Sequence, residues 1–347
     1  MNKNLIDKLS NDKCLTQEEF VCLIENFSAE DAAYAEFLAR SLTDETYGHD
    51  IYMRGLIEFT NYCKNDCYYC GIRCSNKKAE RYRLSFEEVL LCADAGYELG
   101  FRTFVLQGGE DPWYNCERTC ELVASIKERY PECAVTLSIG EKSRKEYQAL
   151  YDAGAERYLL RHETADAEHY AKLHPASLSL ENRKRCLYDL RDIGFQVGTG
   201  FMVGSPYQTF DCIARDLIFI HDLNPHMIGI GPFIPHKDTQ FADMPQGSVE
   251  LTIFLISLLR IMIPSALIPA TTALGTLDSS GRERGIYAGS NVLMPNISPS
   301  DARSKYLLYD GKLQAGDVAA ESQRIMNERL RAIGFNPVVA RGDSKVK

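Results

Sequence analysis

The chain has 347 residues, of which 45% are hydrophobic and 25% charged, and its formal net charge is -9 at pH 7. This composition is that of a globular protein with a large core, and it excludes a disordered or fibrous chain. The acidic balance is the opposite of that expected for a non-specific nucleic-acid binder, so we expect no nucleic-acid partner.

Hydropathy argues against a membrane protein. The longest apolar stretch, residues 251–274, is interrupted by one arginine and two prolines, so it is too broken to span a bilayer. The N-terminal residues lack the apolar core of a signal peptide. We therefore expect a cytoplasmic protein with no membrane partner. In that reducing compartment the 12 cysteines should not form structural disulfides. Four of them fall between Cys63 and Cys74, which indicates a metal or catalytic site.

Residues 1–50 predict a helical N-terminal extension. Thr16, with Glu19 three residues later, fits a helix-capping box. Ser28 and Asp31 give another helix start before an Ala-rich run.

From residue 54 onward, short apolar runs alternate with longer amphipathic stretches. The eight predicted strands are Gly55–Phe59, Thr103–Leu106, Ala134–Leu137, Arg157–Leu160, Gln196–Phe201, Met227–Gly231, Ala266–Ala270 and Ser290–Leu293. The predicted helices between them are Ser85–Leu99, Cys116–Tyr130, Ser143–Asp152, Asn182–Ile193, Phe210–Leu223 and Val249–Ile261. This alternation predicts parallel β/α units. Eight units in about 240 residues match an α/β fold of the TIM type, a (β/α)8 barrel; a doubly wound sheet is the alternative.

The chain is expected to divide into an N-terminal helical extension (1–50), the barrel (51–300) and a C-terminal segment that closes the barrel (301–347). Between the seventh and eighth strands, the Gly/Ser-rich stretch SSGRERG at residues 279–285 predicts no clear helix. The C-terminal segment carries a further helical pattern, Val318–Ile333, closed by a glycine.

Cys63, Cys67 and Cys70 form a CxxxCxxC motif directly after the first predicted strand. Three thiolates at this spacing can hold a single metal centre, and a barrel would place their loop at the carboxyl-end face, where active sites lie. A structural zinc site or a closed iron–sulfur cluster needs a fourth ligand, which Cys74 could supply. Residues 71–78 indicate a turn away from the loop, which disfavours both.

Other polar residues follow predicted strands. Thr136 and Ser138 share one face of the third strand, so either they or their apolar neighbours point into the barrel. Charged residues directly follow the fourth strand. Their burial would cost free energy unless they were paired or exposed to water, and the mouth of a barrel is exposed to water. His162 and His236 are candidate acid/base groups.

The CxxxCxxC motif, with Tyr69 before its last cysteine, resembles that of the radical S-adenosylmethionine (SAM) enzymes. The resemblance implies one [4Fe–4S] cluster with Cys63, Cys67 and Cys70 as ligands and a free iron that binds SAM. Reductive cleavage of SAM would then yield a 5'-deoxyadenosyl radical, with the cofactors carrying the chemistry. No catalytic acid or base is demanded of the protein, so the catalytic residues are left unassigned.

The same resemblance implies which residues contact SAM. The glycine pair in the GGE stretch would cup the methionine amino group, Glu163 would bind the ribose hydroxyls or the amino group, and Arg183 would hold the carboxylate through its planar fork. The full set of expected cofactor contacts is Tyr69, Gln107, Gly108, Gly109, Ser138, Glu163, Arg183 and Met202.

Over residues from about 54 to 310 the chain is similar to the HydE family of [FeFe]-hydrogenase maturases, in segments such as CKNDCYYCGIR, ERYLLRHETA, IGIGPFIPHKDT and YLLYDGK. This implies a role in building the two-iron subcluster of hydrogenase, on a small iron substrate that bears cysteine, carbon monoxide and cyanide. The residues expected to line the cavity for this compact anion are Thr136, Arg161, Thr271, Thr272, Met294 and Tyr306. Further implied partners are an electron donor such as ferredoxin or flavodoxin, and other hydrogenase maturases.

Three alternatives remain. Methylornithine synthase shares the fold and is the main competitor. Biotin synthase is disfavoured because no cysteine follows Cys212 to complete its second cluster. The third, non-catalytic alternative is a closed four-cysteine metal site that only supports the fold or a partner interface.

The number of clusters is a separate question. Some HydE proteins carry a C-terminal cysteine triad that this chain lacks, which predicts a single cluster here.

Overall fold

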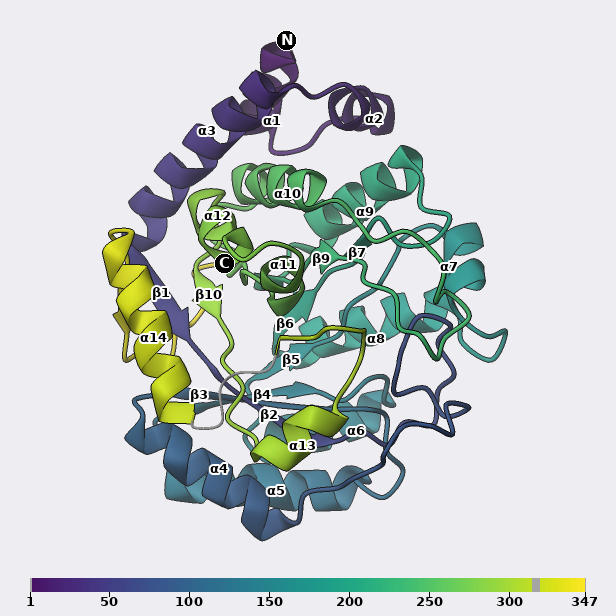
Figure 1. The fold of residues 1–347 in the computed structure, drawn as a ribbon, viewed down its shortest axis with the longest axis vertical. Coiled ribbons are helices and arrows are strands. Elements are labelled where there is room, and N and C mark those ends of the chain that lie inside the picture. Colours follow the sequence, from purple (N-terminus) through teal and green to yellow (C-terminus); the bar gives the residue numbers. More distant parts are fainter. Residues whose placement is uncertain (1, 314–318, 347) are drawn as a thin grey trace.

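The computed structural model describes residues 2–313 and 319–346, and it shows a ring of parallel strands surrounded by helices (Figure 1). Six strands pair in parallel in the order β2-β3-β4-β5-β6-β8. These strands are β2 (Gly55–Thr60), β3 (Thr103–Gly108), β4 (Ala134–Ser138), β5 (Arg157–Leu159), β6 (Gln196–Thr199) and β8 (Met227–Ile228). Beyond the ends of β6 and β8, the short strands β7 (Met202–Val203) and β9 (Gly231–Pro232) pair with each other.

The remaining strands close the ring. The seventh predicted strand, Ala266–Ala270, makes only single bridges, to β8 on one side and to β10 (Val292–Leu293) on the other. Pro269 lies within it and has no N–H to donate, so a regular ladder cannot form there. On its other side β10 pairs in parallel with β1 (Asp50–Met53), which runs directly into β2. The predicted (β/α)8 barrel is therefore confirmed.

All six predicted barrel helices are present in the outer layer. They are α4 (Phe86–Glu98), α5 (Cys116–Arg129), α6 (Arg144–Asp152), α8 (Leu180–Ile193), α9 (Phe210–Leu223) and α10 (Val249–Met262), with the short α7 (Ala167–Leu173) between β5 and α8. Complete capping boxes start α4 at Ser85 and α6 at Ser143. Helix α10 is buried on nearly every side, which agrees with its almost uninterrupted apolar sequence.

The N-terminal helices provide the outer cover of α10. They are α1 (Lys3–Asp12), α2 (Gln17–Glu25) and α3 (Ala29–Tyr47), and Figure 1 shows them outside α9 and α10. Both expected caps are confirmed, at Thr16 and at Ser28. Phe27 stacks on Phe254 of α10 with 4.3 Å between ring centroids. Among the helices of the described residues, none is long and apolar enough to cross a bilayer.

The expectation of no clear helix between the seventh and eighth strands is wrong. Two short helices lie there, α11 (Thr272–Leu277) and α12 (Gly281–Tyr287). Gly281 permits the tight turn between them, because a Cβ at this position would lie 2.5 Å from the carbonyl oxygen of Leu274. Arg284 of α12 forms ion pairs with Glu250 and Asp278, which hold the helix in place. The composition of the stretch suggested a loop, but tertiary contacts stabilise a helix.

The C-terminal segment packs around the barrel. It contains α13 (Ser300–Lys305), α14 (Ala319–Ala332) and β11 (Asn336–Val338), which adds to β1 outside the ring. Helix α14 matches the predicted helical pattern, although its first predicted residue, Val318, lies outside the described residues.

The tail after β11 covers the amino-terminal end of the barrel. Buried Arg157 on β5 pairs with Asp343, with 2.6 Å between Nη2 and Oδ1. Buried Arg54 donates to the carbonyl of Gly342, and the Thr103 hydroxyl donates to the carbonyl of Arg341. These contacts close the floor of the barrel and leave its opposite, carboxyl-terminal end for a site.

Candidate active site

A cavity of about 390 Å³, the barrel cavity, lies at the carboxyl end of the strands. It is lined by the loops after β2, β3, β4 and β5, by residues at β7 and β9, and by part of the C-terminal segment. Of the residues predicted to hold the metal, contact SAM or line the substrate cavity, all except Thr136 line it: Cys63, Cys67, Tyr69, Cys70, Gln107, Gly108, Gly109, Ser138, Arg161, Glu163, Arg183, Met202, Thr271, Thr272, Met294 and Tyr306. The fold thus gathers residues that are up to 243 positions apart (306 − 63) in the sequence.

The cysteine loop follows β2 and is held in shape by arginines. Arg73 makes two hydrogen bonds to the Asp66 carboxylate, 2.7 Å and 3.0 Å long, and this pairing lowers the pKa of Asp66 to about 2. Arg81 donates to the backbone carbonyls of Asn61 and Ile72, on either side of the loop. The three thiols are therefore presented to the cavity by a loop with its own internal supports.

Cys74 is placed differently from the three cysteines of the motif. Its side chain is exposed and does not line the barrel cavity, whereas Cys63, Cys67 and Cys70 are partly buried and do. The Cys74 backbone N–H donates to the carbonyl of Asn65 over 2.9 Å, at the point where the chain turns outward. This arrangement favours three thiol ligands over four.

The glycine pair at the end of β3 lies against the cysteine loop. A Cβ on Gly109 would lie 2.2 Å from the Tyr62 carbonyl oxygen and 2.7 Å from the Cβ of Cys63. The next residue, Glu110, accepts a backbone hydrogen bond from Lys64 over 2.9 Å. Only glycine allows the two backbones to approach this closely, so the β3 end and the cysteine loop form one unit.

Gly109→Ala is expected to displace the cysteine loop, because the added methyl group cannot fit against backbone atoms. We expect the anaerobically reconstituted variant to lose most of its bound iron, with SAM cleavage lowered at least about tenfold. Iron analysis and the rate of 5'-deoxyadenosine formation measure the two effects. Gly285→Ala is the matched control, since its Cβ would have ordinary contacts of 3.4 Å and longer. Normal iron content in Gly109→Ala would contradict the expectation.

Two charged residues after β5 reach the cavity, together with Arg183 on α8. Glu163 has a left-handed backbone conformation, with φ of 66°, which is uncommon for a residue with a side chain and occurs where function requires it. Its Oε2 lies 3.4 Å from Nη2 of Arg161. Arg183 pairs with Glu141, with 2.6 Å between Nε and Oε1, and donates to the Arg161 carbonyl. These groups form a charged wall near the cysteine loop, since Arg183 and Glu163 both act electrostatically on Cys67.

The two candidate acid/base histidines lie outside the barrel cavity. His162 points away from it, with Nδ1 2.9 Å from the Thr199 hydroxyl and Nε2 3.3 Å from Asp216. Burial lowers the pKa of His162 to about 3. His236 is buried and packs against Gly71. Alternation along the chain explains His162: its neighbours Arg161 and Glu163 take the cavity side.

Thr136 is the exception among the predicted cavity residues. It shares a strand face with Ser138, as expected, but Ser138 lies at the barrel mouth and Thr136 lies one layer deeper. There it lines a separate small cavity near the barrel floor, together with Arg54 and Arg157. Residues two apart on a strand differ by about 6.6 Å in height, so the expectation that both reach one cavity is corrected for Thr136.

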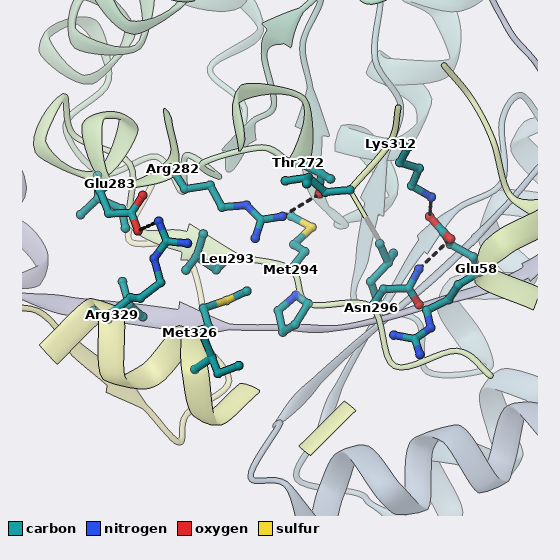
Figure 2. Close-up of a pocket in the computed structure, with 17 residues that line it drawn as sticks. Glu58, Thr272, Arg282, Glu283, Leu293, Met294, Asn296, Lys312, Met326 and Arg329 are labelled. Carbon is teal, nitrogen blue, oxygen red and sulfur yellow. Dashed lines mark hydrogen bonds and ion pairs between the residues drawn. The ribbon is translucent and has the colours of Figure 1, made fainter. Parts of the chain in front are cut away.

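One charged group that lines the barrel cavity was not among the residues predicted from the sequence. Glu58, buried within β2, accepts hydrogen bonds from Lys312 over 2.5 Å and from Asn296 over 2.6 Å (Figure 2). Arg282 on α12 and Tyr309 also line the cavity. A glutamate in the middle of an apolar strand was a usable signal, because such a charge needs a buried partner. Nothing in the sequence around Lys312 or Arg282 indicated that either residue would line the cavity.

Comparison with known proteins agrees with this geometry. The model of the radical SAM superfamily matches residues 57–220. The chain is 44% identical to the [FeFe] hydrogenase maturase subunit HydE of Thermotoga maritima over 86% of both chains. It is 28% identical to a 3-methylornithine synthase of Methanosarcina acetivorans, over 93% of this chain and 90% of that protein. The crystal structure of methylornithine synthase (PylB) superposes with a TM-score of 0.79 and 26% identity, covering 96% of this chain and 97% of that one.

The matched residues include the cysteine loop, the glycine pair and the charged wall after β5. The radical SAM family implies a [4Fe–4S] cluster and SAM as cofactors. With the barrel, the cavity and these likenesses in agreement, the chain belongs to the radical SAM superfamily of enzymes, in the family of the [FeFe]-hydrogenase maturase HydE.

Proposed function

We propose that this enzyme acts in assembly of the two-iron subcluster of [FeFe]-hydrogenase, on a small cysteine-containing iron carbonyl/cyanide substrate. The observation that carries the proposal is the barrel cavity, which is lined both by three thiols and by cationic and hydroxyl side chains. The 44% identity to HydE extends over 86% of this chain, which supports the same class of substrate.

The residues present fit the implied cofactors. In our proposal Cys63, Cys67 and Cys70 hold the cluster, and the remaining iron is left for SAM. When bound, the cluster and SAM supply a 5'-deoxyadenosyl radical after one-electron reduction, with ferredoxin or flavodoxin as the proposed class of donor. Glu163 carries a buried Oε2 that has Arg161 as an ion-pair partner at 3.4 Å but no hydrogen bond among the described residues, so it keeps hydrogen-bonding capacity for a ligand.

We assign the SAM contacts to residues near the cysteine loop. Gly108 and Gly109 offer backbone groups to the methionine moiety, and Glu163 and Arg183 offer charged groups to its polar ends. The remaining proposed contacts are Tyr69, Gln107, Ser138 and Met202, all of which line the cavity. His174 supports the position of Tyr69, since the Tyr69 hydroxyl lies 3.3 Å from Nε2 of His174. Burial lowers the pKa of His174 to about 3, so this partner is neutral.

The substrate occupies the far part of the cavity in our proposal. Thr271, Thr272 and Tyr306 offer hydroxyl groups there, Arg161 offers positive charge and Met294 an apolar surface. The Thr271 hydroxyl is buried, and the described residues offer it no hydrogen-bond partner. These side chains orient a compact anion and exclude water around it. They do not need to move a proton, because the reactive species comes from the cofactors.

Substrate-dependent cleavage of SAM tests this function. The reconstituted enzyme is incubated anaerobically with SAM, a reductant and a synthetic iron complex of cysteine, carbon monoxide and cyanide. We expect the complex to stimulate formation of 5'-deoxyadenosine and to be consumed with it. If the complex does not stimulate formation of 5'-deoxyadenosine, the proposal is overturned. Formation of 3-methylornithine from a mixture of the common amino acids would instead favour methylornithine synthase activity, the alternative that the 0.79 TM-score supports.

A further inference from the structure

A second cavity of about 240 Å³ adjoins the barrel cavity on the side of α12 and α14 (Figure 2). We call it the side chamber, and much of its wall is apolar, including Leu56, Ile286, Pro295 and Leu330. The two cavities share lining residues, so the side chamber continues the barrel cavity outward. The shared residues are Leu56, Glu58, Thr272, Arg282, Leu293, Met294, Lys312 and Met326.

The charges around this junction are mostly neutralised by one another. Glu58 is paired with Lys312. Across the side chamber, Glu283 is paired with Arg329 over 2.6 Å (Figure 2). In the barrel cavity, Arg161 lies beside Glu163 and Arg183 beside Glu141. Each of these cations already has a carboxylate from the protein.

Arg282 differs from those cations. Its side chain is half-buried and lines both cavities. Its Nη2 donates a long hydrogen bond of 3.3 Å to the Thr272 hydroxyl (Figure 2). Its Nε is buried and has no hydrogen-bond partner, and no carboxylate in the described part of the chain forms an ion pair with it. Glu283 acts on Arg282 electrostatically but forms no ion pair with it, and burial still lowers the pKa of Arg282. Burial of this guanidinium is therefore costly, and a ligand that brings an anion would be bound favourably.

The local backbone leaves room for this side chain to lie at the junction. A Cβ on Gly275 of α11 would lie 3.2 Å from Nε and 3.4 Å from Cγ of Arg282. Glycine at this position therefore lets the arginine lie flat across α11. The guanidinium is held at the junction by packing on one side and by Thr272 on the other, while donors remain free for a ligand.

We propose that Arg282 is a specificity-determining residue that binds the carboxylate of the substrate's cysteine ligand at the junction of the two cavities. This inference rests on the proposed function. A planar guanidinium binds a carboxylate through two parallel hydrogen bonds, which gives both affinity and orientation. Thr272, which we place against the substrate, already contacts Arg282, so the two side chains present their donors to one region. The carboxylate thereby orients the iron toward the barrel interior.

A pair of substrates tests the assignment directly. Binding to the reconstituted, SAM-loaded enzyme is measured by anaerobic calorimetry for the iron complex of cysteine and for the same complex with cysteamine, which lacks the carboxylate. The wild-type enzyme should prefer the cysteine complex by about tenfold to a hundredfold, the range for a charge-assisted hydrogen bond. Arg282→Gln should bind both complexes equally and weakly. Arg282→Lys should recover part of the preference, because it keeps the charge without the fork.

Two controls separate this role from a structural one. Arg324→Gln makes the same charge change on the exposed face of α14 and should keep the full preference. Arg282→Gln should keep the iron content and the chemical-denaturation midpoint of wild type, which shows an intact fold and cluster site. If wild type binds both complexes equally, the assignment of Arg282 fails and the proposed function stands. If wild type binds neither complex, the proposed function fails and the assignment with it.

Discussion

Cys67→Ala is expected to abolish both the iron–sulfur absorbance of the anaerobically reconstituted protein and all reductive cleavage of SAM. Cys67 is the middle thiol of the motif and lines the barrel cavity with Cys63 and Cys70. A four-iron cluster held by three cysteines has no spare protein ligand, so loss of one thiolate leaves two irons open. The visible absorbance of the cluster and a chromatographic assay of 5'-deoxyadenosine measure the effect. Undiminished 5'-deoxyadenosine from this variant would refute the assignment of the triad.

The matched control is Cys74→Ser, four residues beyond Cys70 in the same segment. Because Cys74 is exposed and does not line the cavity, we expect this variant to keep its iron, its absorbance and its SAM cleavage. Loss of the metal in Cys74→Ser would show that four cysteines hold it. The argument for an open iron, and the chemistry built on it, would then collapse.

Replacement of Arg260 should give the largest loss of stability of any single charge in the barrel wall. Arg260, on α10, is fully buried. Its guanidinium donates to the backbone carbonyls of Gly289, Pro264 and Ala266 over 2.7–2.9 Å and to the Asn291 side chain over 3.2 Å. These groups lie at the starts of the seventh and eighth strands. Burial lowers the pKa of Arg260 to about 9, so the side chain remains charged at pH 7.

We expect Arg260→Met to lower the free energy of unfolding by about 3 kcal/mol, because three buried carbonyls lose their donor. The chemical-denaturation midpoint of the anaerobic protein measures this change. Arg324→Met is the control, since Arg324 is exposed and makes only an i,i+4 pair with Glu328, a contact worth a few tenths of a kcal/mol. Equal midpoints for the two variants would show that the buried network is not needed for stability.

Much of the barrel could be predicted from sequence because its strands and helices are locally consistent. Capping residues such as Thr16 and Ser28 mark helix starts through bonds that span only three positions. The cysteine motif could be placed in the active site because it directly follows a strand. The seventh strand was harder, since Pro269 interrupts its ladder. The division of the chain at residues 50 and 300 stays a prediction.

The missed features depend on contacts between distant parts of the chain. Glu58 and Lys312 are 254 positions apart, and neither position alone indicates the pair. Helix α12 forms in a Gly/Ser-rich stretch because ion pairs with other elements hold it. The depth of Thr136 could not be read from alternation, which gives the face of a strand but not the height along it. Arg282 differs from the other cavity cations because no carboxylate among the described residues forms an ion pair with it, and sequence spacing does not show that.

The tail that covers the barrel floor has a consequence for biosynthesis. Asp343 and its neighbours are translated after every strand of the ring, so Arg157 and Arg54 lack these partners while the strands are being made. Before residues 341–343 are made, two buried cations face an open end of the barrel, which disfavours a completed fold. The ring should therefore reach its final stability only after these residues have been translated.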